Sequence, residues 1–232
     1  MTPLIDGPRL NSASGQVKQL VVFLHGYGAD GNDLIEIGKQ WQHWLPDAAF
    51  VSPHAPSPCG MSPMGREWFP LTFRDPHERW RGVNAGQPVL DAFLDSELKR
   101  HSLSASALAL VGFSQGCMMA LHSGLRRAKP PAAILGLSGM LVLPDGQGPE
   151  VLHQEKLAGK IGPTPILLTH GGADEVIPVD ALFMSAEALG AAEIPCQWHL
   201  SPRMGHAIDG ECLRQGGLFL MQNFGIPLPK LR

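Results

Sequence analysis

Leu-Val-Gly-Phe-Ser-Gln-Gly, residues 110–116, places Ser114 in a Gly-x-Ser-x-Gly pentapeptide directly after an apolar run. Residues 107–111 predict a buried strand, and residues 115–127 predict a helix with an apolar face. A strand that turns this sharply into a helix leaves no room for side chains beside the serine, which explains the two glycines. The pentapeptide alone also occurs in ordinary turns, but between a strand and a helix it predicts that Ser114 is a nucleophile.

Strand and helix patterns alternate along the chain, which predicts an α/β fold with a mostly parallel central sheet and helices on both faces. Two expected strands are continuously apolar, as in a parallel sheet that is covered on both faces. No linker or repeat divides the sequence, so we expect one domain over residues 1–232. The expected strands are 17–24, 48–52, 107–111, 132–138, 165–169 and 195–200, and the expected helices are 32–45, 87–101, 115–127, 178–190 and 209–224. Residues 53–86 show no period and are expected to form a long loop.

Composition and charge exclude several classes of protein. The chain has 232 residues, 44% of them hydrophobic and 17% charged, with a net charge of −3 and no run of more than two adjacent Lys or Arg residues. A nucleic-acid partner therefore has no electrostatic footprint. No apolar stretch approaches the ~18 residues of a membrane span, and the N-terminus does not read as a secretion signal. We expect a cytoplasmic protein whose four cysteines (Cys59, Cys117, Cys196 and Cys212) are free thiols.

A serine nucleophile needs a base, and the base needs a group that orients it. On an α/β sheet these groups follow strands, in the chain order serine, acid, histidine. Asp174 follows the expected strand 165–169, and His206 follows the expected strand 195–200. Glu175 is an adjacent competitor for the acid, and Asp180 is better explained by the dipole of a helix N-terminus. We therefore predict a triad of Ser114, His206 and Asp174.

Ester hydrolysis also needs two N–H groups that stabilise a tetrahedral oxyanion. The residue after the nucleophile, Gln115, supplies one at a helix N-terminus. The glycine-rich loop at residues 24–31 follows an early strand, and we expect the amide of Tyr27 to supply the other. His25 in that loop is interpreted as a structural brace rather than a ligand. No His-Glu-x-x-His or similar spacing occurs, so we predict that the protein uses no metal and no cofactor.

Four motifs in register resemble the carboxylesterase/acyl-protein thioesterase (phospholipase/carboxylesterase) family of α/β-hydrolases. They are Leu-His-Gly-Tyr-Gly-Ala-Asp at 24–30, Gly-Phe-Ser-Gln-Gly at 112–116, Gly-Gly-Ala-Asp-Glu-Val-Ile-Pro at 171–178 and Gly-His-Ala-Ile at 205–208. The resemblance implies an α/β-hydrolase fold without a separate cap domain, the same triad and the same oxyanion donors. Many members have leucine where this chain has Tyr27, which bears on substrate fit rather than on catalysis. Some members are dimers, so the resemblance makes a homodimer plausible.

Two apolar loops supply candidate residues for an acyl pocket. Methionine and aromatic side chains adapt to flexible apolar groups, although each could equally pack the loops onto the core. The resemblance favours Trp68 and Phe69, because the family often has a tryptophan–aromatic pair beside the active site. The candidates are Met61, Met64, Trp68, Phe69, Leu71 and Phe73 in the first loop and Met140 and Leu141 in the second.

The sequence therefore predicts a serine hydrolase that cleaves neutral carboxylic esters, with short to medium acyl chains favoured. Its partner would be a small-molecule or lipid ester. An acyl-protein thioesterase or a lysophospholipase is an open alternative, because the resemblance does not separate these substrates. A peptidase lacks an extra specificity signal, and a dienelactone-type hydrolase would carry cysteine at position 114. A binding protein that keeps only the fold would need neither the acid nor the base.

Overall fold

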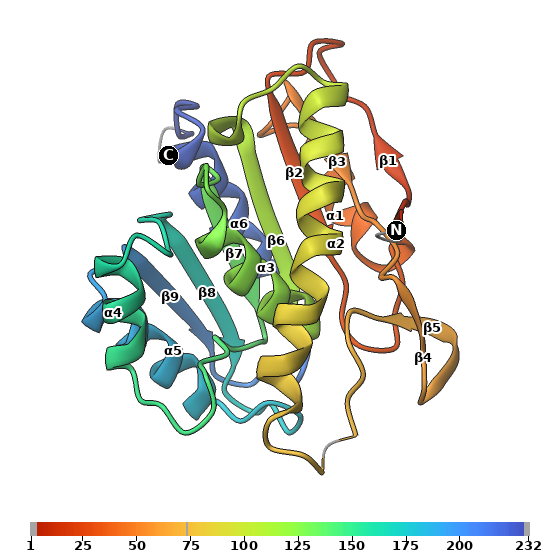
Figure 1. Ribbon diagram of the computed structural model, residues 1–232. Coiled ribbons are helices and arrows are strands. Elements are labelled where there is room, and N and C mark those ends of the chain that lie inside the picture. Colours follow the sequence, from red (N-terminus) through yellow and green to blue (C-terminus); the bar gives the residue numbers. More distant parts are fainter. Residues whose placement is uncertain (1–3, 73, 230–232) are drawn as a thin grey trace.

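The computed structural model describes residues 4–72 and 74–229, and a twisted sheet forms its centre (Figure 1). Within these residues the sheet has seven strands in the order β1-β3-β2-β6-β7-β8-β9. Adjacent strands run parallel except at one edge, where β1 is antiparallel to β3. The strands are β1 (Arg9–Leu10), β2 (Gln19–Leu24), β3 (Ala48–Val51), β6 (Leu108–Phe113), β7 (Ala133–Leu137), β8 (Ile166–Gly171) and β9 (Cys196–Ser201).

Helices cover both faces of the sheet (Figure 1). One face packs against α1 and α6, and the other packs against α2, α3, α4 and α5. The central strands are mostly apolar and buried along nearly their whole length, because helices cover both of their faces. The helices are α1 (Asn32–Trp41), α2 (Glu78–Arg100), α3 (Gln115–Arg126), α4 (Glu150–Leu157), α5 (Asp180–Ala191) and α6 (Gly210–Asn223). The predicted fold class is confirmed, and most predicted elements end within about two residues of the observed bounds.

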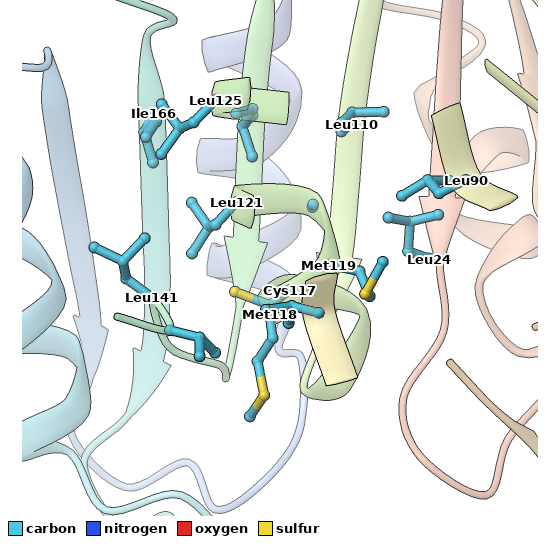
Figure 2. Close-up of a cluster of buried hydrophobic side chains, with 14 of the residues drawn as sticks. Leu24, Leu90, Leu110, Cys117, Met118, Met119, Leu121, Leu125, Leu141 and Ile166 are labelled. Carbon is cyan, nitrogen blue, oxygen red and sulfur yellow. The ribbon is translucent and has the colours of Figure 1, made fainter. Parts of the chain in front are cut away.

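Helix α3 holds the segment after Ser114 against the sheet. All of its residues from Gln115 to Leu125 are buried, because the helix lies between the sheet and α2. Figure 2 shows Leu121 and Leu125 among the side chains that belong to the same cluster as Ile166 of β8. Truncation of one such buried leucine to alanine typically costs about 2–5 kcal/mol. The start of α3 is therefore held in place by a large part of the core.

The predicted loop at 53–86 is wrong in two places. Residues within it form a hairpin, β4 (Ser57–Cys59) and β5 (Ser62–Glu67), which lies outside the central sheet (Figure 1). Helix α2 begins at Glu78, well before the predicted residue 87, and it contains Pro88. Proline removes one helical hydrogen bond, but Pro88 is exposed and the apolar side of α2 stays buried on both sides of it. Tertiary packing thus overrides the local signal.

Other elements carry too little pattern to be predicted. The edge strand β1 has only two residues, and Arg9 fixes it to α2 with Nε and Nη2 hydrogen bonds of 3.1 and 2.9 Å to Glu97. Helix α4 is short and mostly polar, with only Leu152 buried. The predicted helix 32–45 begins as expected but ends at Trp41.

None of the helices formed by the described residues is long and apolar enough to cross a membrane.

Strand order creates a switch point at the carboxyl edge of the sheet. The chain runs from β2 to its neighbour β3 and then crosses to β6 on the other side of β2. The loops that follow β2 and β6 therefore diverge, and ligands of open α/β sheets bind at such a switch point. Tyr27 follows β2 and Ser114 follows β6, while Asp174 and His206 follow β8 and β9 at the same edge.

Candidate active site

Ser114 lies in a tight turn between β6 and α3. Its backbone has φ 53° and ψ −115°, and its N–H donates a 2.9 Å hydrogen bond to the carbonyl of Leu137. A Cβ atom added at Gly116 would lie 1.9 Å from the Leu24 carbonyl oxygen. A Cβ atom added at Gly112 would lie 2.2 Å from the Gly116 carbonyl oxygen. Both glycines are therefore required by close backbone packing around the serine.

The side chains of Ser114, His206 and Asp174 form one hydrogen-bonded chain. The Nε2 atom of His206 lies 2.9 Å from the Ser114 Oγ, and its Nδ1 atom lies 2.8 Å from the Asp174 Oδ2. A carboxylate accepts hydrogen bonds, so Nδ1 carries the proton and Nε2 is free to accept one from the serine. This is the arrangement by which a base activates a hydroxyl nucleophile.

Asp174 is held as an anion at the end of this chain. Its Oδ1 accepts hydrogen bonds of 2.9 Å from the amides of Val176 and Ile177. Burial alone would raise the pKa of Asp174, but the hydrogen bonds from His206 and these two amides outweigh burial and lower it. His170 supports the same loop, because its Nε2 donates to the Ile177 carbonyl at 2.8 Å and lies 3.4 Å from the Asp174 Oδ2.

Competing acids do not share this environment. The side chain of Asp174 is fully buried, whereas Glu175 and Asp180 are exposed. Asp180 lies in the first turn of α5, where the helix dipole favours an acid. The structure therefore brings Asp174 to the histidine and leaves both competitors in solvent.

Two contacts that the sequence does not predict support the loop that carries His206. The Oγ of Ser138, which follows β7, donates a 2.8 Å hydrogen bond to the carbonyl of Ala207. The ring of Phe113 also lies 5.0 Å from the ring of His206. Both contacts join segments that are far apart in sequence, so no local pattern could have indicated them.

The glycine-rich loop after β2 lies directly against Ser114. A Cβ atom added at Gly26 would lie 3.4 Å from the Ser114 Cβ. Tyr27 is the next residue, and its hydroxyl donates to the Leu71 carbonyl at 3.4 Å. Helix α3 begins at Gln115, whose N–H is among the first in the helix and has no partner within it. The loop that carries Tyr27 and the first residue of α3 thus both adjoin Ser114.

The predicted acyl-pocket residues of the first loop separate into two groups. Met61 and Met64 lie in the β4–β5 hairpin and are 73% and 91% exposed. Leu71 is buried, and Phe73 lies outside the described residues. The exposed methionines do not join the buried residues in one cavity.

Trp68 and Phe69 are buried, at 3% and 2% exposure, and their backbones are hydrogen-bonded to the Gln115 side chain. The indole N–H of Trp68 donates to the carbonyl of His25. Such buried, bonded side chains leave little surface for an acyl group. These two residues instead contact Gln115 and His25, which lie in the segments next to Ser114.

A groove of 640 Å³ lies between the loop after β7 and helix α5. Val176 and Ile177, which hold Asp174, form part of its wall, although Ser114 does not line it. Arg79, Asp145, Asp180 and Glu187 place charges among its mainly apolar lining. The predicted pocket residues Met140 and Leu141 both line it, together with Leu143, Val176, Ile177 and Met184.

The His, Cys, Asp and Glu side chains of the described residues form neither a metal-binding cluster nor a disulfide. Among residues 4–72 and 74–229, no group of three or more His, Cys, Asp or Glu side chains is arranged to hold a metal ion. The four cysteines are free thiols, as the sequence predicts.

Similarity to known proteins agrees with this geometry. Residues 6–223 match the phospholipase/carboxylesterase family. Esterase YpfH of Escherichia coli (strain K12) is 29% identical over 221 residues, which cover 95% of this chain and 88% of that protein. Acyl-protein thioesterase 1 of Gibberella zeae is 27% identical over 232 residues, which cover 92% of this chain and 94% of that protein.

Among solved structures, esterase PE8 is 41% identical, with a TM-score of 0.86 over 95% of this chain and 99% of that chain. The match to the family covers nearly the whole sequence and confirms the resemblance seen in its four motifs. The chain belongs to the phospholipase/carboxylesterase family of hydrolases and has the α/β-hydrolase fold.

Proposed function

We propose that this protein is a serine esterase that cleaves carboxylic esters through an acyl-enzyme on Ser114. The observation that carries the proposal is the chain of hydrogen bonds from the Ser114 Oγ through His206 to Asp174, at 2.9 and 2.8 Å. A buried, ionised acid, an imidazole oriented by it and a serine within hydrogen-bond distance of that imidazole make up the machinery of acyl transfer.

In the proposed mechanism, the Ser114 Oγ attacks the acyl carbon while the Nε2 of His206 takes its proton. Asp174 stabilises the imidazolium that forms and keeps its Nδ1–H in place. His206 then protonates the leaving alcohol, and the acyl–Ser114 ester remains. A water molecule, deprotonated by the same Nε2, hydrolyses this ester and returns the serine.

The amides of Tyr27 and Gln115 are proposed to bind the oxyanion of both tetrahedral intermediates. Their support is the contact between the Gly26 loop and Ser114 and the start of α3 at Gln115. One such donor typically contributes a factor of about 10²–10³ in kcat. The backbone amide of residue 27 makes the proposed interaction, so a tyrosine in place of the family's usual leucine leaves this donor unchanged.

The substrate we favour is a neutral ester with a short to medium acyl chain. The apolar groove beside Asp174 supports this choice, with Met140 and Leu141 among its lining residues. A thioesterase activity is the second candidate, because two related proteins of similar length are acyl-protein thioesterases. A lysophospholipase activity remains a third alternative. The single-domain organisation, a homodimer and a cytoplasmic location stay predictions from the sequence.

The test is a burst assay with p-nitrophenyl acetate and p-nitrophenyl octanoate on the wild type and on Ser114→Ala. We expect the wild type to show a burst equal to the enzyme concentration and the variant to lose about 10⁴-fold or more in kcat. An inactive wild type, or a fully active variant, would overturn the proposal. Palmitoyl-CoA and lysophosphatidylcholine as substrates separate the alternatives.

A second arm of this test adds EDTA. Because the proposed chemistry uses only side chains and amides, we expect activity to persist in EDTA. Loss of activity that a divalent ion restores would contradict a metal-free mechanism.

A further inference from the structure

The segment of residues 55–69, here called the brace segment, is bound to the loop that carries Tyr27. The Gly28 N–H donates to the Arg66 carbonyl at 3.0 Å, and the Arg66 N–H donates to the Ala29 carbonyl at 2.7 Å. A Cβ atom added at Gly65 would lie 2.0 Å from the Gly28 carbonyl oxygen. The two backbones are thus paired at van der Waals contact beside the proposed oxyanion donor.

The ring of His25 fixes the direction of the Tyr27 N–H. The Gly26 carbonyl belongs to the same planar peptide group as the Tyr27 N–H, so holding one orients the other. The His25 Nδ1 donates to the Gly26 carbonyl at 2.8 Å, and its Nε2 accepts from the Ala55 N–H at 3.0 Å. Burial lowers the pKa of His25 to about 4, so the ring stays neutral and can donate and accept in this way.

Trp68 extends this support from the brace segment. Its indole N–H donates to the His25 carbonyl at 2.9 Å, and the two rings lie 5.6 Å apart. The peptide groups before and after Gly26 are therefore both held, one by Trp68 and the other by His25.

The Gln115 side chain joins the same tryptophan to the second donor. Its Oε1 accepts from the Trp68 N–H at 2.9 Å, and its Nε2 donates to the Phe69 carbonyl at 2.7 Å. The side chain is buried and uses both of its polar ends on the brace segment. Trp68 is thus bonded through its indole to the loop of one proposed donor and through its backbone to the residue that supplies the other.

We propose that Trp68, His25 and the Gln115 side chain are positioning residues that hold the two oxyanion-binding amides in register. This inference rests on the proposed esterase function, and it assigns Trp68 a role other than the wall of an acyl pocket. A change in these contacts would shift amides that matter most in the transition state. Substrate binding would change little, whereas kcat would fall.

The chain offers a matched control for Trp68. Trp41 is also buried, and its indole N–H donates to the Leu213 carbonyl at 3.0 Å. It lies in the core on the other face of the sheet. Trp41→Phe and Trp68→Phe therefore remove the same kind of hydrogen bond and a similar volume, and only one of them affects the proposed brace.

We expect Trp68→Phe to lower kcat for p-nitrophenyl acetate by about 10-fold with KM unchanged, while Trp41→Phe keeps the wild-type kcat. Gln115→Met keeps the Gln115 N–H but removes both side-chain bonds, and we expect a similar fall in kcat. The inhibition constant of an alkyl trifluoromethyl ketone, which forms a tetrahedral oxyanion on the serine, should rise by the same factor. Thermal unfolding gives the stability of each variant.

The outcomes separate the inference from the function on which it rests. An inactive wild type would overturn the esterase proposal itself. With an active wild type, unchanged kcat in Gln115→Met or in folded Trp68→Phe would overturn the positioning role. Equal losses of kcat in Trp68→Phe and Trp41→Phe would do the same, because they would reflect stability alone. If Trp68→Phe does not fold, Gln115→Met decides.

Discussion

The backbone of Ser114 has a positive φ of 53°, a conformation that L-residues rarely adopt. Strain of this kind typically costs about 1–3 kcal/mol, and the packing of α3 and the hydrogen bond to Leu137 offset it. In this turn the Ser114 Oγ lies within hydrogen-bond distance of His206, so the position of the hydroxyl depends on the packing that surrounds the turn.

Gly116 provides a direct test of that dependence. In Gly116→Ala the new methyl group would lie 1.9 Å from the Leu24 carbonyl oxygen, which must move or push α3 away. We expect a loss of about 1–3 kcal/mol in unfolding free energy and of about 100-fold in kcat. Urea unfolding and p-nitrophenyl acetate hydrolysis measure the two effects.

Gly190 in α5 is the matched control, because a Cβ atom added there meets nothing within 4 Å apart from its chain neighbours and the backbone of its own helix. Gly190→Ala should leave kcat unchanged and stabilise the helix by up to about 1 kcal/mol. Equal behaviour of the two variants would show that close packing at Gly116 has no role.

The sequence singles out Ser114, Asp174 and His206 because each follows an apolar strand, and the structure places His206 within hydrogen-bond distance of both other side chains. The contacts that support them could not be predicted in the same way. The roles of Trp68 and Gln115 depend on bonds between residues 46 or 47 positions apart. Trp68 was therefore interpreted as a possible pocket wall, although the structure buries it against His25.

The elements show a similar division. Long apolar strands and amphipathic helices were predicted correctly, because their periodicity reflects burial. The β4–β5 hairpin was missed because Pro58 and Pro63 interrupt any alternation. The start of α2 was missed because Pro88 reads as a helix breaker, although tertiary contacts carry the helix through it.

The groove between the loop after β7 and α5 predicts a dependence on acyl length. Met184 lines the groove and is exposed, so Met184→Glu adds a charge there with little cost to folding. We expect kcat/KM for p-nitrophenyl octanoate to fall about 10-fold while the value for the acetate stays within about twofold. Steady-state kinetics with both esters measure this change.

Leu157 of α4 is similarly exposed but does not line the groove, so Leu157→Glu serves as the control. It should leave both esters unaffected. If Met184→Glu retains wild-type activity on the octanoate, the acyl chain does not run along α5.

Across the whole molecule, two buried histidines link stability to pH. Burial lowers the pKa of His25 to about 4, and burial with the nearby Arg126 cation lowers the pKa of His122 to about 3. Below about pH 6.5 both histidines bind protons in the unfolded chain, whereas in the folded chain they stay neutral until the pH approaches their lowered pKa values. Stability from these groups is therefore complete above that pH and falls by about 1.4 kcal/mol per pH unit per histidine toward pH 4.

His122→Leu removes one of these groups, whose ring packs against Trp80 of α2. We expect urea unfolding between pH 6.5 and 4 to show a slope that is shallower by about 1.4 kcal/mol per pH unit. His43, which is exposed, provides the control variant His43→Gln. If His122→Leu leaves the pH slope of the unfolding free energy unchanged, this histidine binds its proton as readily in the folded chain as in the unfolded chain.

The order of the strands also has a consequence for the protein as it is made. Ser114 and Asp174 leave the ribosome before His206, which follows β9 at the edge of the sheet. A nascent chain that ends before residue 196 contains Ser114 and Asp174 but lacks His206, the proposed base. Under the proposed function, the serine therefore cannot be acylated efficiently during synthesis, and hydrolysis begins only when the last strand has joined the sheet.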